Sequence, residues 1–246
     1  MIAKTVSVIA ANWWFYLFFA ILLLILAGLA DAGILKAGNG AVNTMLWLMF
    51  ARFVHRAALF NVKFAEANPD GSVDRSYGGF MLKGLALLVV SLILSLPVLL
   101  WTMGSKVTAS AAPTLRDVYP FLLALLIIYA LVLSLAGSWL PASVYKQNPG
   151  LGAALRRGSR TFFNVLAWIA PTLLLAIIVE FAALFAFSLF NFNLSILSNG
   201  VIHPTGGLAL LVVILIESFS VSLISVVLSH YYLVAEGIEN RAKPVA

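Results

Sequence analysis

Residues 82–103 read LKGLALLVVSLILSLPVLLWTM and carry one charged side chain, Lys83, in 22 positions. A run of about 20 apolar residues is what an α-helix needs to cross the hydrocarbon core of a bilayer. Further runs of this kind lie at 118–142, 165–190 and 207–234. These four segments predict membrane-spanning helices, so the fold class that we expect is an all-α polytopic transmembrane bundle.

The composition of the whole chain agrees with that class. Its 246 residues are 63% hydrophobic and 10% charged, and the mean hydropathy is +1.05. A soluble domain carries about 25% charged residues because its surface faces water. Fifteen Lys and Arg with nine Asp and Glu are too few for a soluble protein of this length. We therefore expect a single integral membrane domain over residues 1–246.

The first apolar run, 13–29, raises the question of a signal peptide, because Ala30, Asp31 and Ala32 after it have a small-x-small pattern. The run is long, begins with aromatic residues, and has only Lys4 before it. A signal peptide has a charged start and a shorter apolar region. We therefore expect a retained membrane-spanning helix.

The segment that leaves the number of spans open is 41–62, AVNTMLWLMFARFVHRAALFNV. It begins with apolar residues and then holds Arg52, His55 and Arg56. Ionisable side chains are costly in lipid unless they face the protein interior. The segment therefore either spans the membrane or lies at its surface. Counting Lys and Arg in the loops does not separate these options, because both place most cations on the cytoplasmic side.

A weak internal repeat favours six spans. The turns at 68–71 (NPDG) and 148–150 (NPG) lie 80 positions apart, and each precedes a short amphipathic stretch and a new apolar run. The first dozen residues are also amphipathic. The predicted unit is an amphipathic helix on the inner leaflet followed by two spans. It would occur three times, over 1–70, 71–150 and 151–240, which gives three hairpins with both termini inside.

The stretch 140–164 resembles a group of bacterial membrane proteins. It contains LPASVY at 140–145, NPG at 148–150 and GAALRRGSRTFFN at 152–164. This pattern is similar to the membrane domain that is fused to some glycerophosphodiester phosphodiesterases and also occurs alone in integral membrane proteins. The resemblance implies six spans in the bacterial cytoplasmic (inner) membrane with both termini inside. It implies no catalytic residue, because the fused proteins carry their hydrolase chemistry in a separate soluble domain.

Two acidic residues within the predicted spans are candidates for a functional site. Glu180 lies 10 residues before Phe190, and Glu217 lies 10 residues after Gly207. At about 1.5 Å per residue, both lie roughly 15 Å from the outer surface, near the bilayer midplane. Arg52 would lie at a similar depth. An Arg–Glu–Glu cluster either relays protons or cations or holds the helices together, and the sequence leaves both interpretations open.

A second candidate site is basic. Arg156, Arg157 and Arg160 fall on one face of a helix that we expect at the inner membrane surface. They either bind the headgroup of an anionic lipid or only fix the orientation of the chain in the membrane.

Other sequence patterns bear on the type of protein. The chain has no Cys, and His55, His203 and His230 are scattered, so we expect no metal and no cofactor. The phosphate loop and Gly-x-Ser-x-Gly motifs are missing. The net charge of +6 is explained by cytoplasmic Lys and Arg, so we expect no nucleic-acid partner.

We therefore expect a non-enzymatic membrane protein whose partners are membrane lipids or other membrane proteins. Its role would be that of an accessory or scaffold protein that binds anionic lipid or partner proteins through its basic inner face. The alternative is a small transporter or lipid-handling protein that uses Arg52, Glu180 and Glu217.

Overall fold

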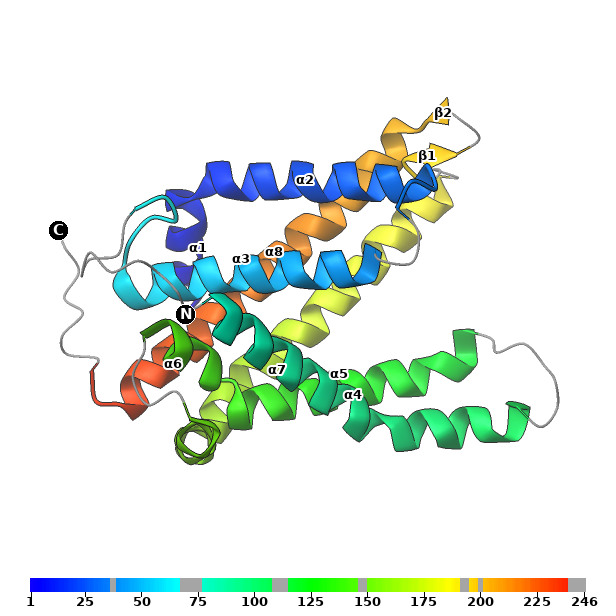
Figure 1. Ribbon diagram of the computed structural model, residues 1–246. Helices are drawn as coiled ribbons and strands as arrows, with labels where there is room; N and C mark the ends of the chain where they lie inside the picture. The colour runs from blue at the N-terminus through cyan, green and yellow to red at the C-terminus, as the bar shows by residue number, and fades with distance from the viewer. Residues whose placement is uncertain are drawn as a thin grey trace.

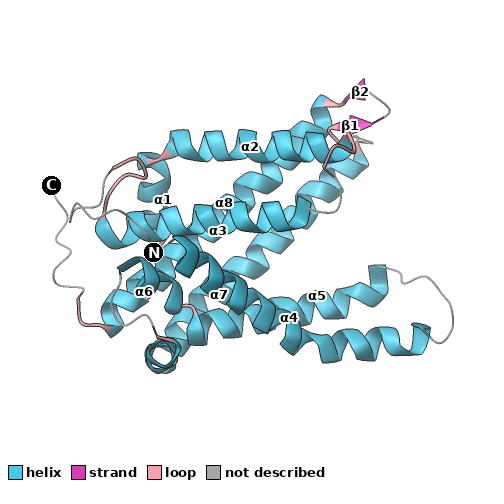
Figure 2. Cartoon of the chain, in the orientation of Figure 1, coloured by secondary structure: helices cyan, strands magenta, loops and turns pink. Residues whose placement is uncertain are grey.

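The structure, a computed structural model, describes residues 1–35, 39–66, 77–107, 115–145, 150–190, 195–198 and 201–238. This part of the chain is almost wholly helical (Figures 1 and 2). The helices are α1 (Ile2–Ala11), α2 (Trp13–Asp31), α3 (Asn39–Phe60), α4 (Tyr77–Val107), α5 (Leu115–Ala136), α6 (Trp139–Tyr145), α7 (Leu151–Leu189) and α8 (Pro204–Ala235). Two short strands, β1 (Leu197–Ser198) and β2 (Val201–Ile202), pair antiparallel before α8.

Five of the described helices, α2, α4, α5, α7 and α8, are long and apolar enough to cross a membrane. This confirms the prediction of an all-α protein with several apolar spans. The segment 41–62, which the sequence leaves either spanning the membrane or lying at its surface, falls mostly within α3, a helix of 22 residues. Its sequence holds two Arg residues and one His, so it is less apolar than the other five.

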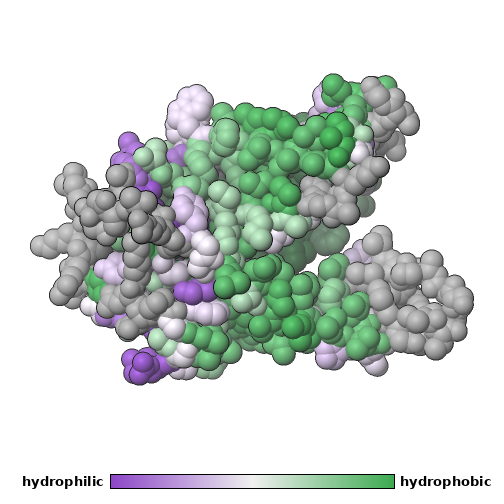
Figure 3. Space-filling model, in the orientation of Figure 1, coloured by the Kyte–Doolittle hydropathy of each residue, from purple (hydrophilic) through white to green (hydrophobic). Residues whose placement is uncertain are grey.

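The outer surface of the helices is hydrophobic over most of their length (Figure 3). Large apolar side chains point outward, and Trp101 of α4 and Phe163 of α7 are 81% and 80% exposed. Hydrophilic residues gather toward the end where α1 and α6 lie (Figures 1 and 3). An apolar surface of this extent would be unstable in water and is typical of a protein surrounded by lipid.

Helix α8 lies at the centre of the packing, and its serines face other helices. The Tyr16 hydroxyl on α2 and the Ser222 hydroxyl are 2.6 Å apart, and His55 Nδ1 on α3 is 2.8 Å from Ser229 Oγ. Small side chains let helices approach closely in a membrane, and hydroxyl groups bond across the interface. As a result α3 packs more extensively on α8 than on α2.

The N-terminal segment turns sharply between α1 and α2 at Asn12. The Asn12 amide donates to the Val8 carbonyl at 2.8 Å, and its Oδ1 accepts from the Phe64 backbone N–H at 2.7 Å. These two bonds hold α1 across the end of α2 (Figure 1). The side chains of Ile2 and Val6 are half exposed, so α1 presents an apolar face to its surroundings.

One predicted element has a different form. A short amphipathic helix followed by a separate span was expected after residue 150, but α7 is one continuous helix of 39 residues. The helix continues without a break from Arg160 to Val165, between the basic turns and the apolar run. At about 1.5 Å per residue α7 is roughly 58 Å long, twice a hydrocarbon core of about 30 Å. In the expected counterpart after residue 71, positions 71–76 lie outside the described residues, and Tyr77 to Lys83 are the first turns of the continuous helix α4.

Helices α5 and α7 touch at their closest point around Gly158. A Cβ atom on Gly158 would lie 1.8 Å from the Leu135 carbonyl oxygen, whereas one on Gly152 would meet nothing within 4 Å. Glycine is therefore required at position 158, where the two backbones meet. Farther along α7, the space between α5 and α7 widens into a cleft.

We predict that Gly158→Ala destabilises the protein by roughly 1–3 kcal/mol, because the new methyl group forces α5 and α7 apart. The matched control is Gly152→Ala on the same helix, which should be neutral or stabilise by up to about 1 kcal/mol through helix propensity. Unfolding of the purified protein in detergent measures both. Equal stability of the two variants would show that the close approach of α5 and α7 is absent.

Candidate functional site

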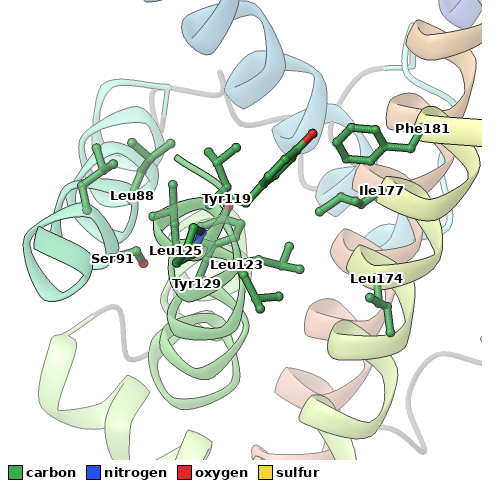
Figure 4. Close-up of a pocket in the computed structure, with 13 residues that line it drawn as sticks. Leu88, Ser91, Tyr119, Leu123, Leu125, Tyr129, Leu174, Ile177 and Phe181 are labelled. Carbon is green, nitrogen blue, oxygen red and sulfur yellow. The ribbon is translucent and has the colours of Figure 1, made fainter. Parts of the chain in front are cut away.

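A large apolar cleft lies between α4, α5 and α7 and has a volume of about 900 Å³. Figure 4 shows Leu88 and Ser91 on α4, and Ile177 and Phe181 on α7, around side chains of α5. Most of the lining is leucine, isoleucine and phenylalanine, and its polar groups are the hydroxyls of one serine and two tyrosines. The cleft is therefore suited to a hydrocarbon chain.

The cleft opens at the lipid-facing surface of the protein. Leu123 on α5 and Phe181 on α7, which line it, are 55% and 53% exposed. Figure 3 shows the surface hollowed between the part formed by α4 and α5 and the rest of the molecule. An acyl chain in the bilayer can therefore enter the cleft from the side.

A second, smaller cavity of about 290 Å³, which we call the acidic pocket, adjoins the cleft. It lies between α3, α5, α7 and α8, and Glu180 and Glu217 both line it. The cleft and the acidic pocket share three lining residues, Leu126, Tyr129 and Ile177. The apolar cleft is thus continued by a pocket with two carboxyl groups.

The two carboxyl groups line the same pocket, so they would repel each other if both were charged. No hydrogen bond or ion pair joins Glu180 or Glu217 to another residue in the part of the chain that the structure describes. His55 also lines the pocket, is 1% exposed, and is bonded to Ser229. An acidic pocket in apolar surroundings favours a proton or a bound cation, because either reduces the repulsion.

The structure places Arg52 apart from the two glutamates, where the sequence had suggested one cluster. Its guanidinium lies 3.4 Å from the ring centroid of Tyr77, at the start of α4, and the side chain is wholly buried. Arg52 is not among the described residues that line the acidic pocket. A long arginine side chain reaches several ångströms along the helix from its backbone position, so a depth counted from the sequence does not locate its charge.

The three arginines of the predicted basic site lie together near the junction of α7 and α8. A cavity of about 160 Å³ is lined by Arg156, Arg157 and Arg160 together with Glu236, from the end of α8. Arg157 is buried: it donates to Glu236 Oε1 at 2.7 Å and lies over the Tyr232 ring. Arg157 therefore takes part in the contact between α7 and α8, and binding of a lipid headgroup by the three arginines stays a prediction. Arg156 and Arg160 are exposed, and Arg157 joins α7 to α8.

Two residues of the acidic pocket were not identified from the sequence. Trp47 lies on α3 and packs edge-on against Phe19, with ring centroids 5.1 Å apart. Tyr129 lies on α5 between the pocket and the cleft. A lone tyrosine in the middle of the apolar run 118–142 was a usable signal, because aromatic residues with a polar atom favour the ends of membrane spans.

Comparison with known protein families, with curated proteins and with solved structures finds no match for this chain. The resemblance in residues 140–164 therefore stays a prediction. Among the described residues, no group of three or more His, Cys, Asp or Glu lies together as a metal site requires. The candidate site therefore consists of the cleft and the acidic pocket.

We predict that Arg157→Met destabilises the protein by about 3 kcal/mol, because it removes one member of a largely buried ion pair. Exposed Arg160 on the same helix is the matched control, and Arg160→Met should change stability by less than about 0.5 kcal/mol. Adding Glu236→Gln to Arg157→Met should restore part of the loss. Thermal unfolding in detergent measures the three variants, and equal effects of the two single substitutions would contradict the buried pair.

Proposed function

We propose that the protein is a six-span protein of the bacterial cytoplasmic membrane with both termini inside. The sixth span is α3, whose polar side chains face the protein. His55 is bonded to α8, and Arg56 donates to the carbonyl oxygens of Phe64 and Glu66 in the turn after α3. These contacts satisfy polar groups that would be costly in lipid.

In this arrangement the six spans form three successive hairpins. Helix α4 packs on α5, and α7 packs on α8, as neighbours in sequence. Helices α2 and α3 form the remaining hairpin, although α3 has its larger contact with α8. The exposed apolar face of α1 and the first turns of α7 are placed at the inner leaflet, where amphipathic helices bind.

The function that the geometry supports best is that of a lipid-handling protein, which binds an amphiphilic molecule taken sideways from the bilayer. The observation that carries this proposal is the junction of two cavities. An apolar cleft open to lipid leads to a pocket with two carboxyl groups, and the two share Leu126, Tyr129 and Ile177. An amphiphile has the same division, with an apolar chain and a polar head. The proposed role is binding and transfer, with no covalent chemistry.

The size of the cavities agrees with this role. Small-molecule sites occupy about 300–1,000 Å³ and are mostly apolar with a few polar groups. The cleft, at about 900 Å³, falls in this range, and the acidic pocket adds about 290 Å³. Together they have room for one chain and one small head.

A second candidate is an accessory or scaffold protein that binds anionic lipid or a partner membrane protein. The observation in its favour is that Arg156 and Arg160 are exposed beside exposed Leu151 and Leu155 on the first turns of α7. Each exposed cation near an anionic membrane contributes about 1 kcal/mol to binding. This role uses two of the three predicted arginines, because Arg157 is bonded to Glu236.

We predict that Ile177→Trp blocks the cleft. The protein is reconstituted in phosphatidylcholine vesicles with a long-chain alcohol that carries a photoactivatable diazirine in its chain, and labelled residues are mapped by mass spectrometry. Labels should concentrate on the parts of α5 and α7 that line the cleft. The larger indole should reduce this labelling several-fold, because it fills the junction of cleft and pocket.

The matched control is Ile178→Trp, the same substitution at the next residue, which is 54% exposed and does not line the cleft. It should leave labelling in the cleft unchanged. Labels spread evenly over the lipid-facing surface, with no difference between the two variants, would contradict a lipid-handling function and favour the scaffold.

A further inference from the structure

We infer that the preferred ligand is an amphiphile with one apolar chain and a cationic ammonium head, and that the head binds in the acidic pocket between Glu180 and Glu217. This inference rests on the proposed function and specifies its ligand. The chain would lie in the cleft, so that the molecule extends from the pocket toward the lipid.

Charge complementarity is the first argument for a cation. Glu180 and Glu217 bring two carboxyl groups to one cavity in mostly apolar surroundings. Repulsion between charges grows as the surroundings exclude water, so the ionised pair is unfavourable alone. An ammonium group between the carboxylates would replace this repulsion with two charge-assisted hydrogen bonds or ion pairs.

Aromatic residues in the same pocket provide the second argument. Trp47 and Tyr129 both line it. The faces of aromatic rings attract cations, and tryptophan attracts them most strongly. Rings combined with carboxylates are a typical lining for alkylammonium groups, whereas they give no advantage to an anionic head.

The lining of the acidic pocket also disfavours anionic and neutral headgroups. The described residues that line the acidic pocket include no Lys or Arg. A phosphate or carboxylate head would therefore meet two carboxylates without a compensating cation, which is strongly unfavourable away from water. A neutral hydroxyl head would fit, but it would leave the repulsion between Glu180 and Glu217 in place.

The position of the pocket explains why the cation should carry a chain. A small cation without a chain would occupy only the acidic pocket and would make no contact with the neighbouring apolar cleft. Leu126, Tyr129 and Ile177 line both cavities, so an alkyl chain attached to a head in the pocket continues into the cleft through a mostly apolar junction. Burial of each methylene there contributes favourably to binding.

The test uses three photoactivatable probes with the same diazirine-bearing alkyl chain and different heads: a primary amine, an alcohol and a carboxylic acid. Each is added to the reconstituted protein in phosphatidylcholine vesicles at equal concentration in the membrane. Labels on the cleft residues of α5 and α7 are counted by mass spectrometry. We expect the amine to label the cleft roughly tenfold more than the alcohol, because one hydrogen bond between charged groups is enough for a tenfold difference in binding. The acid should label it least.

Two variants test the role of the carboxylates, Glu217→Gln and Glu180→Gln. Each should lower labelling by the amine toward that by the alcohol and leave labelling by the alcohol unchanged. The unchanged alcohol signal shows that the variant is folded and that the cleft is intact. The matched control is Glu66→Gln, the same change at an exposed acid in the turn after α3, which should keep the preference for the amine.

The possible outcomes separate the two proposals. Equal labelling of the cleft by amine and alcohol in the natural protein would overturn the ammonium head and leave the lipid-handling function standing. A preference for the amine that survives in both glutamine variants would also overturn it. Absence of cleft labelling by every probe would overturn both the proposed function and this inference.

Discussion

The constraint on which the structure depends is that the polar side chains of a bundle with an apolar outer surface must be surrounded by protein. Helix α3 shows it most clearly, because it carries three cationic or titratable side chains within five residues. Arg52 lies over Tyr77, His55 is bonded to Ser229, and Arg56 is bonded to the following turn. Buried serines of the central helix α8 provide polar partners inside the bundle, Ser229 for His55 of α3 and Ser222 for Tyr16 of α2.

The candidate site follows from a second feature, the shape of the contact between α5 and α7. Gly158 lets the two backbones touch at one end, and the cleft forms where they separate. The acidic pocket lies at the inner limit of this cleft, with α3 and α8 as its other walls. One arrangement of helices thus gives both an opening to lipid and a pair of carboxyl groups that favours a cationic ligand. The buried Arg157–Glu236 pair fixes α7 to α8 at the closed end.

The sequence predicted much of this structure, and the failures have physical causes. Apolar runs of about 20 residues located the five apolar helices, because helix length in lipid is set by bilayer thickness. Counting the rise per residue put Glu180 and Glu217 at one depth, and they line one pocket. Arg52, counted to a similar depth, lies over Tyr77 and does not line that pocket. The fate of Arg157 depends on Glu236, 79 residues away, and the cleft depends on how helices diverge, so neither is readable from local patterns.

The most direct test of the account is whether α3 crosses the membrane, because α3 supplies one wall of the acidic pocket. The chain has no cysteine, so single cysteines can be placed at either end of α3 without background. Gly40→Cys has open space around it, and Ala65→Cys lies in the exposed turn after the helix. If α3 spans the membrane, an impermeant maleimide labels Gly40→Cys from the periplasm of intact cells and labels Ala65→Cys only after the membrane is permeabilised. Labelling of both positions from the same side would contradict a membrane-spanning α3.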